Sequence, residues 1–201
     1  MRDEVQRDFE RSARALRDVV FPALQTSCPA FQGMEVEVLL DHHNPLQHDL
    51  DTIAGIDAYL RSPLALRTIA ARVQYGYPYR TFTIRVARPQ QALTELQKRL
   101  SQLASRESGA LYPYWSVHAY LSLDGTRLSC AAIAKTSELY LWMVQQFANR
   151  DPRDLRWPFE TRISREQERF IIIPWDAYRA SGNYFFEYAD RSLMEHTQKR
   201  Q

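Results

Sequence analysis

Cysteine and glycine are both scarce in this chain of 201 residues, and their scarcity excludes several kinds of site. The two cysteines, Cys28 and Cys130, are far apart and form no CxxC pair, which excludes a zinc knuckle and argues against a disulfide framework. We therefore expect buried, reduced thiols and a cytoplasmic protein. Only six glycines are present, and the chain contains no glycine-rich phosphate-binding loop.

Long apolar runs and a strong charge imbalance are also missing. No run approaches the ~20 apolar residues of a membrane helix, and the charged residues 1–4 do not resemble a secretory signal, so we expect no membrane partner. The net charge of +2 gives no global basic field for nucleic acid. Arginines are nevertheless frequent in the central stretch, where they form either a phosphate-binding surface or a solvated face. We expect nucleic acid to contact Arg67, Arg80 and Arg85.

The composition is that of a globular protein with a sizeable core. Hydrophobic residues make up 45% and charged residues 25% of the chain. A chain of this length suits one domain, spanning 1–201. We expect its core over about 4–148 and a C-terminal extension over about 149–201.

Hydrophobic periodicity predicts an α/β (α+β) protein with a central mixed sheet flanked by helices. Apolar residues spaced by three and four predict helices, one of which carries a leucine stripe from Leu93 through Leu96 and Leu100 to Leu103. Alternation predicts strands, with Asp124-Gly125 as a hairpin turn. The expected helices span residues 3–24, 89–105 and 136–148. The expected strands span residues 34–40, 52–60, 69–75, 80–86, 115–121, 127–134, 170–173 and 184–188, and those between 52 and 86 are expected to form an antiparallel meander.

Asp57 is the acid whose surroundings most suggest chemistry. It stands between Ile56 and Ala58, and an acid among apolar neighbours is costly unless it is paired, protonated or bound to a cation. In the strand expected at residues 69–75, Arg72 and Gln74 share one face. We therefore expect an acid, an amide and a guanidinium to converge at a sheet edge. The alternative is that Asp57 merely caps a turn.

The expected order of elements resembles that of the PD-(D/E)XK nuclease superfamily, whose members have a restriction-endonuclease-like fold. The order is helix, strand, strand with an acid, strand with a polar doublet, helix and strand. Ala54-Gly55-Ile56-Asp57 is similar to the segment that carries the family's first acid. Arg72-Val73-Gln74-Tyr75-Gly76 falls where the (D/E)XK triplet is expected, with Gln74 in place of a carboxylate and Gly76 in place of the lysine. The resemblance covers roughly residues 4–135.

This resemblance implies a restriction-endonuclease-like core and metal-dependent hydrolysis of nucleic acid, with DNA as the expected substrate and Mg²⁺ as the expected cation. It implies Asp57, Gln74 and Glu10 as metal ligands. The missing positive charge is expected from Arg72, which lies on the face of Gln74, or from Lys98, with Glu95 one helical turn before it; we favour Arg72. The alternatives are a surface pair of Glu95 and Lys98, and a non-catalytic module that binds nucleic acid or a protein.

Two further features have competing interpretations. The segment Asp41–Asp51 is rich in histidine and aspartate, which suit either a transition-metal site or a polar surface loop, and we expect a loop because Asn44-Pro45 interrupts it. The aromatic runs at residues 75–79 and 112–115 suit either stacking on unpaired bases or packing beside strands.

Overall fold

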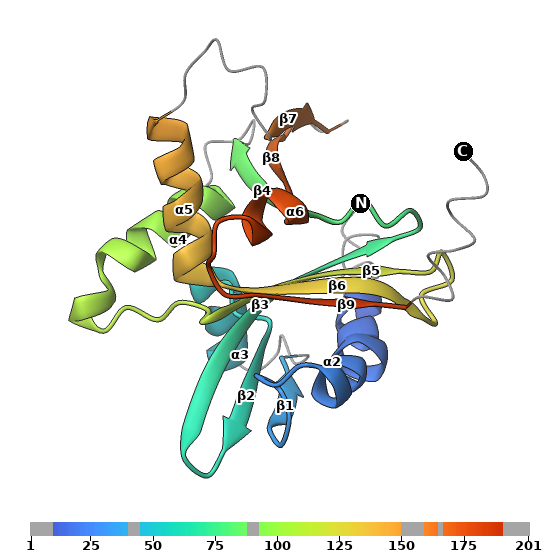
Figure 1. Ribbon diagram of the computed structural model, residues 1–201. Helices are drawn as coiled ribbons and strands as arrows, with labels where there is room; N and C mark the ends of the chain where they lie inside the picture. Colours follow the sequence, from blue (N-terminus) through green and yellow to red (C-terminus); the bar gives the residue numbers. More distant parts are fainter. Residues whose placement is uncertain (1–9, 40–44, 88–92, 150–158, 165–166, 191–201) are drawn as a thin grey trace. The chain divides into compact units, whose positions relative to one another are not determined.

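The computed structural model describes residues 10–39, 45–87, 93–149, 159–164 and 167–190, and the chain divides into two compact units. Unit 1 consists of residues 1–80, 113–133 and 186–201, and unit 2 consists of residues 81–112 and 134–185. A mixed six-stranded sheet lies mainly in unit 1, and a three-stranded sheet lies in unit 2 (Figure 1). Helices accompany both sheets, so the expected α/β class is confirmed.

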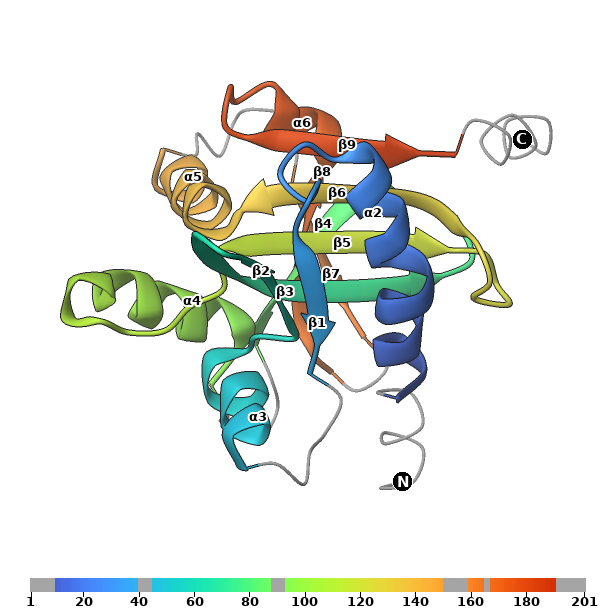
Figure 2. The same ribbon diagram turned by 90° about the horizontal axis from the view of Figure 1, so that it is seen from below.

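The expected N-terminal helix is present from the first described residue, Glu10. Residues 10–15 are α-helical and are followed by a π-helical turn (η1, Leu16–Val20) and by α2 (Phe21–Ser27). Leu16 and Val20 are buried, as expected for the apolar stripe of an amphipathic helix. This helical segment lies across one face of the six-stranded sheet (Figure 2).

The six-stranded sheet has the strand order β1-β2-β3-β5-β6-β9. The first three strands form an antiparallel meander, and β3 then pairs in parallel with β5, with Ile69 opposite Trp115 and Tyr75 opposite Leu121. A parallel pair needs a crossover connection, and residues 76–114 supply it. The strands are β1 (Glu35–Val38), β2 (Ala58–Ser62), β3 (Ala65–Tyr75), β5 (Trp115–Leu121), β6 (Leu128–Lys135) and β9 (Phe185–Ala189).

The strand expected at residues 80–86 forms, but in the other sheet. It is β4 (Thr81–Ala87), which pairs with β8 (Arg169–Pro174), and β7 (Glu160–Ile163) pairs with the other side of β8. The prediction that the meander continues through these residues is therefore wrong, because alternation identifies a strand without identifying its partner.

The helices of unit 2 are α4 (Glu95–Ala104), the 3₁₀ turn η3 (Arg106–Ser108), α5 (Thr136–Ala148) and α6 (Trp175–Arg179). Aromatic side chains make much of this unit's core, since the ring of Phe82 meets those of Trp175 and Tyr178 at centroid distances of 6.1 and 5.6 Å. Across the described residues of both units, no helix is long and apolar enough to cross a membrane.

The leucine stripe of α4 differs from the expectation at its first member. The helix begins after Thr94, whose side chain accepts a hydrogen bond from the backbone N–H of Gln97 in a capping box. Leu93 therefore precedes the helix and is exposed, whereas Leu103 is buried as predicted. Arg99, only 4% exposed, is the other buried residue of α4.

Residues 45–54 are helical, and this contradicts two predictions. They form α3 (Pro45–Asp49) and a second π-helical turn (η2, Leu50–Ala54), so the described part of the expected loop is helix. Proline is tolerated in the first turn of a helix, where its missing N–H is not needed. The strand expected at residues 52–60 is consequently shorter and begins only at Ala58.

Candidate functional site

Asp57 is held at the start of β2 by three hydrogen bonds to its neighbours in the sheet. The turn η2 ends at Gly55, whose φ of 60° is a left-handed conformation that glycine adopts without strain. The backbone N–H of Asp57 donates to the carbonyl of Ile69 at 2.8 Å, and its carbonyl accepts from the N–H of Leu39 at 2.9 Å. Its carboxylate oxygen Oδ2 accepts from the N–H of Ala71 at 2.7 Å. The side chain is therefore fixed against the middle of β3.

A cavity of about 290 Å³ lies beside this carboxylate. Asp57, Asp51 and Arg72 are among the residues that line it, and most of the others are apolar. Ser12 lines it from the N-terminal helix. The other lining residues are Ala13, Leu16, Val38, Leu39, Ala71 and Val73. Asp57 and Arg72, an acid and an arginine expected at the site, thus line the same cavity, together with a second acid, Asp51.

Arg72 is positioned by the parallel pair of β3 and β5. There β3 pairs with β5 alone, since β2 pairs with β3 only over Ala65–Ile69, and the residue opposite Arg72 on β5 is His118, only 6% exposed. His118 is not among the site residues expected from the sequence, and Asp51 is considered there only as part of the histidine- and aspartate-rich segment Asp41–Asp51. Alternation along residues 115–121 was the available signal for His118, because it places this residue on one face with Ser116 and Tyr120.

The structure does not bring Gln74 to the carboxylate of Asp57. Gln74 lies three residues beyond Ala71 on β3, about 10 Å at ~3.3 Å per residue, and is opposite Tyr120 of β5. The reason is the register: the start of β2 meets the middle of β3, whereas Gln74 follows near the end of that strand. Gln74 is accordingly absent from the lining of the cavity that contains Asp57.

Glu10 lines a different cavity, of about 320 Å³, and accepts a 3.3 Å hydrogen bond from Arg14. In this second cavity the guanidinium of Arg11 stacks 3.9 Å from the ring centroid of Tyr75. Asp124, on the same lining, accepts hydrogen bonds from the Ser122 hydroxyl and from the N–H and hydroxyl of Thr126. These bonds lower its pKa to about 2. The cavity therefore contains charges of both signs.

Glu95 and Lys98 lie on α4, in unit 2. The carboxylate of Glu95 accepts a 2.6 Å hydrogen bond from the hydroxyl of Tyr140 and a 3.3 Å bond from the backbone N–H of Arg85. Glu95 is half-buried and ties α4 to α5 and β4, which differs from an exposed surface pair. Lys98 is also half-buried, and its N–H donates to the carbonyl of Thr94 in the first turn.

The three arginines expected to bind nucleic acid have different surroundings. Arg80 pairs with Glu187 at 2.7 Å, and Arg85 pairs with Glu168 at 3.0 Å, so a carboxylate already neutralises each guanidinium. Arg67 is exposed, and its guanidinium carbon lies 4.7 Å from the ring centroid of Tyr114.

Other nucleophile and metal sites gain no support within the described part of the chain. Cys28 and Cys130 form no disulfide and are buried, and burial raises the pKa of the Cys130 thiol to about 12. Three or more His, Cys, Asp or Glu side chains suited to a metal ion are not found together among the described residues. His42 and His43 of the expected transition-metal segment lie outside these residues, as does the side chain of His48.

Comparisons with protein-family models, with curated proteins and with solved structures found no match. Any functional assignment therefore depends on the geometry of the described residues.

Proposed function

We propose that this protein hydrolyses phosphodiester bonds of nucleic acid, DNA above all, at the cavity lined by Asp51, Asp57 and Arg72. The observation that carries the proposal is that two acidic residues, Asp51 and Asp57, and one arginine, Arg72, line one cavity of about 290 Å³. This combination suits a phosphate together with a divalent cation. The arrangement of helix, antiparallel meander and parallel strand around it is consistent with a restriction-endonuclease-like core.

The donor set fits Mg²⁺, which is commonly held by one or two carboxylates together with water and substrate phosphate. Asp51 and Asp57 would hold the cation. The hydrogen bond from Ala71 fixes the orientation of the Asp57 carboxylate before any ligand binds. A bound divalent cation supplies charge stabilisation at the phosphate and a lower pKa for a nearby water.

Arg72 has the role of binding the phosphate. A guanidinium forms short, charge-assisted hydrogen bonds with phosphate oxygens and remains protonated near neutral pH. It therefore stabilises negative charge that develops on the phosphate but cannot act as a base. The buried thiols Cys28 and Cys130 fit a reducing compartment, and we assign the activity to the cytoplasm on that basis.

A second candidate is a nucleic-acid-binding module without catalysis. Two observations favour it: Gly76 stands where the resemblance expects a lysine, and Gln74 lies about 10 Å along β3 from Ala71, at ~3.3 Å per residue. Such a module would bind nucleic acid without needing a cation and would leave the phosphodiester bonds intact.

A plasmid-nicking assay tests both candidates. Supercoiled plasmid is incubated with Mg²⁺ or Mn²⁺, with EDTA as the blank, and the wild type is compared with Arg72→Ala, Arg72→Lys and Lys98→Ala. We expect Arg72→Ala to lose nicking, Arg72→Lys to retain part of it because the charge remains, and Lys98→Ala to match the wild type. The matched control is Arg127→Ala, which removes an exposed arginine of unit 1.

Loss of nicking in the Lys98 variant alone would assign the positive charge to α4 instead of β3. Cation-independent binding by a wild type that never nicks would favour the non-catalytic module. Both candidates would be refuted if neither the wild type nor any variant binds or nicks nucleic acid.

A further inference from the structure

The β2–β3 hairpin of unit 1 extends beyond the end of β5, the strand that pairs with the other side of β3. β2 pairs with β3 over Ala65–Ile69, whereas β5 joins β3 only from Ile69 onward. The β2–β3 turn therefore forms a tip beyond the fully paired part of the sheet, as Figure 1 shows within this unit. Proline fixes one backbone dihedral angle, so Pro63 stiffens this turn.

Two leucines at this tip are exposed to an unusual degree. Leu64 is 97% exposed and Leu66 is 60% exposed. Exposed leucines at a rigid projecting turn are costly in water and gain free energy when a partner covers them.

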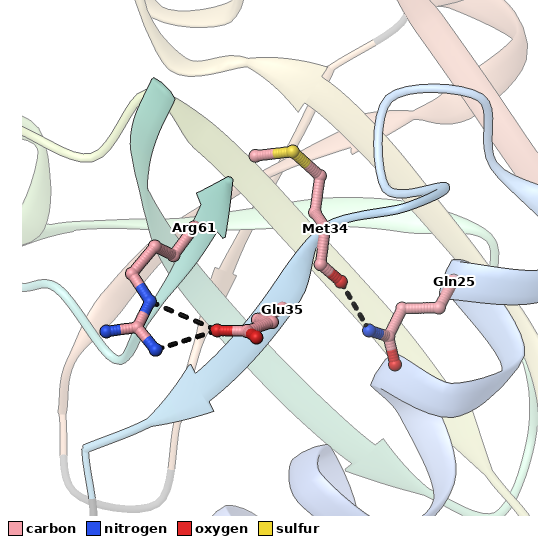
Figure 3. Close-up of polar contacts among 4 residues, drawn as sticks. All are labelled: Gln25, Met34, Glu35 and Arg61. Carbon is pink, nitrogen blue, oxygen red and sulfur yellow. Dashed lines mark hydrogen bonds and ion pairs between the residues drawn. The ribbon is translucent and has the colours of Figure 1, made fainter. Parts of the chain in front are cut away.

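The charges beside these leucines favour a nucleic-acid partner. Arg61 and Arg67 flank the tip in sequence, and both are exposed. Arg61 donates from Nε and Nη2 to Glu35 at 3.1 and 2.7 Å (Figure 3), and because both side chains are exposed this pair contributes little and can exchange for a phosphate. Among the described residues, Arg67 has no carboxylate partner, and its contacts are the Leu66 carbonyl and the Tyr114 ring.

We infer that the β2–β3 turn is a wedge for duplex DNA, in which Leu64 inserts at a base step while Arg61 and Arg67 bind the flanking phosphates. Proteins that bend DNA commonly insert an apolar side chain between base pairs and hold the adjacent phosphates with basic residues. This inference rests on the proposed function, since it names duplex DNA as the substrate.

The wedge and the proposed site are carried by the same strand. Leu66 and Arg72 are six residues apart on β3, about 20 Å at ~3.3 Å per residue, and they lie on the same face. That length corresponds to about six base pairs of duplex at ~3.4 Å each. A duplex that lies along β3 would therefore contact the tip and Arg72 about six base pairs apart.

The test uses a duplex of about 30 base pairs with a fluorescent donor and acceptor at its two ends, in EDTA to prevent cleavage. We expect the wild type to increase energy transfer between the ends, because wedge insertion kinks DNA by roughly 20–90°. Leu64→Ser should abolish the increase and weaken binding by roughly 10- to 100-fold, the loss of one buried leucine. The matched control Leu123→Ser, at a leucine 78% exposed in the same unit, should behave as the wild type.

Binding without a change in energy transfer, no binding to the duplex, or equal behaviour of Leu64→Ser and wild type would overturn the wedge. Sedimentation showing a wild-type dimer that Leu64→Ser dissolves, with no bending, would instead assign the tip to contact with a second copy. Plasmid nicking by the same proteins separates the two proposals. Nicking without bending would refute the wedge alone, whereas bending without nicking would refute the hydrolysis alone.

Discussion

Replacing Asp57 separates its structural contribution from its chemical one. The carboxylate accepts the N–H of Ala71 at 2.7 Å, and a hydrogen bond to a charged group contributes about 1.5–3 kcal/mol. Asp57→Ala leaves this N–H without its acceptor. We therefore expect the free energy of unfolding to fall by about 1–3 kcal/mol. Asp57→Asn keeps an oxygen acceptor at the same position and should cost less than about 1 kcal/mol.

Thermal unfolding of the two variants measures the difference. For a chain of this size, 1 kcal/mol corresponds to a change in Tm of about 2–4 °C. Asp57→Ala should therefore unfold several degrees below Asp57→Asn, while neither variant nicks plasmid with Mg²⁺ or Mn²⁺. Asp18→Ala is the control: its exposed ion pair with Arg17 contributes little, so the Tm should stay near that of the wild type.

Two results would refute this reasoning. Equal Tm values for Asp57→Ala and the wild type would show that the bond to Ala71 does not stabilise the fold. Full nicking by Asp57→Asn would show that the negative charge of Asp57 is not needed, and the proposed site would lie elsewhere.

Three further predictions concern the fold. Gly125→Ala should lower the urea midpoint more than Gly33→Ala. Both glycines have a positive φ, 77° and 70°, but only at Gly125 would an added Cβ meet the Tyr75 ring, at 3.1 Å. Equal midpoints of the two variants would contradict this packing. Asp124→Asn should be less stable than the wild type above about pH 4, and this difference in stability should vanish as the pH falls towards about 2. The reason is that the hydrogen bonds that lower the pKa of Asp124 stabilise the folded state only while its carboxylate is ionised. Urea midpoints at several pH values measure the difference, and a difference that does not change with pH would refute the prediction. Cys130 should not react with a thiol reagent at pH 8 until the protein is denatured, since burial raises its pKa to about 12; rapid labelling of the native protein would show that the thiol is accessible.

The sequence predicts the individual strands better than it predicts their partners. Alternation along residues 34–40, 69–75 and 115–121 identified β1, β3 and β5, because each pattern depends only on side chains within one strand. The pattern of β4 is as clear, yet this strand pairs with β8, nearly ninety residues later. Nothing local in the sequence encodes such a distant pairing.

The candidate site was predictable only in part. The apolar neighbours of Asp57 and the alternation around Arg72 were visible signals, and both residues line the same cavity. The sequence predicts Gln74 at the site as well, because it shares a face with Arg72, but the β2–β3 register places it away from Asp57. The sequence places Asp51 in a segment that Asn44-Pro45 predicts to be a loop, whereas residues 45–54 are helical.

The connectivity of the two units has a consequence for how the chain folds. Unit 1 draws on three separate segments, and β9, at residues 185–189, completes its sheet beside β6. Unit 2 needs residues 134–185 as well as 81–112. During synthesis, therefore, neither unit has all its segments until nearly the whole chain has emerged, and long sequence separations between contacting strands slow folding. Local contacts favour early formation of the meander β1-β2-β3. Until β5 pairs with it, the strand β3, which bears Arg72, would have one edge open to association with other chains.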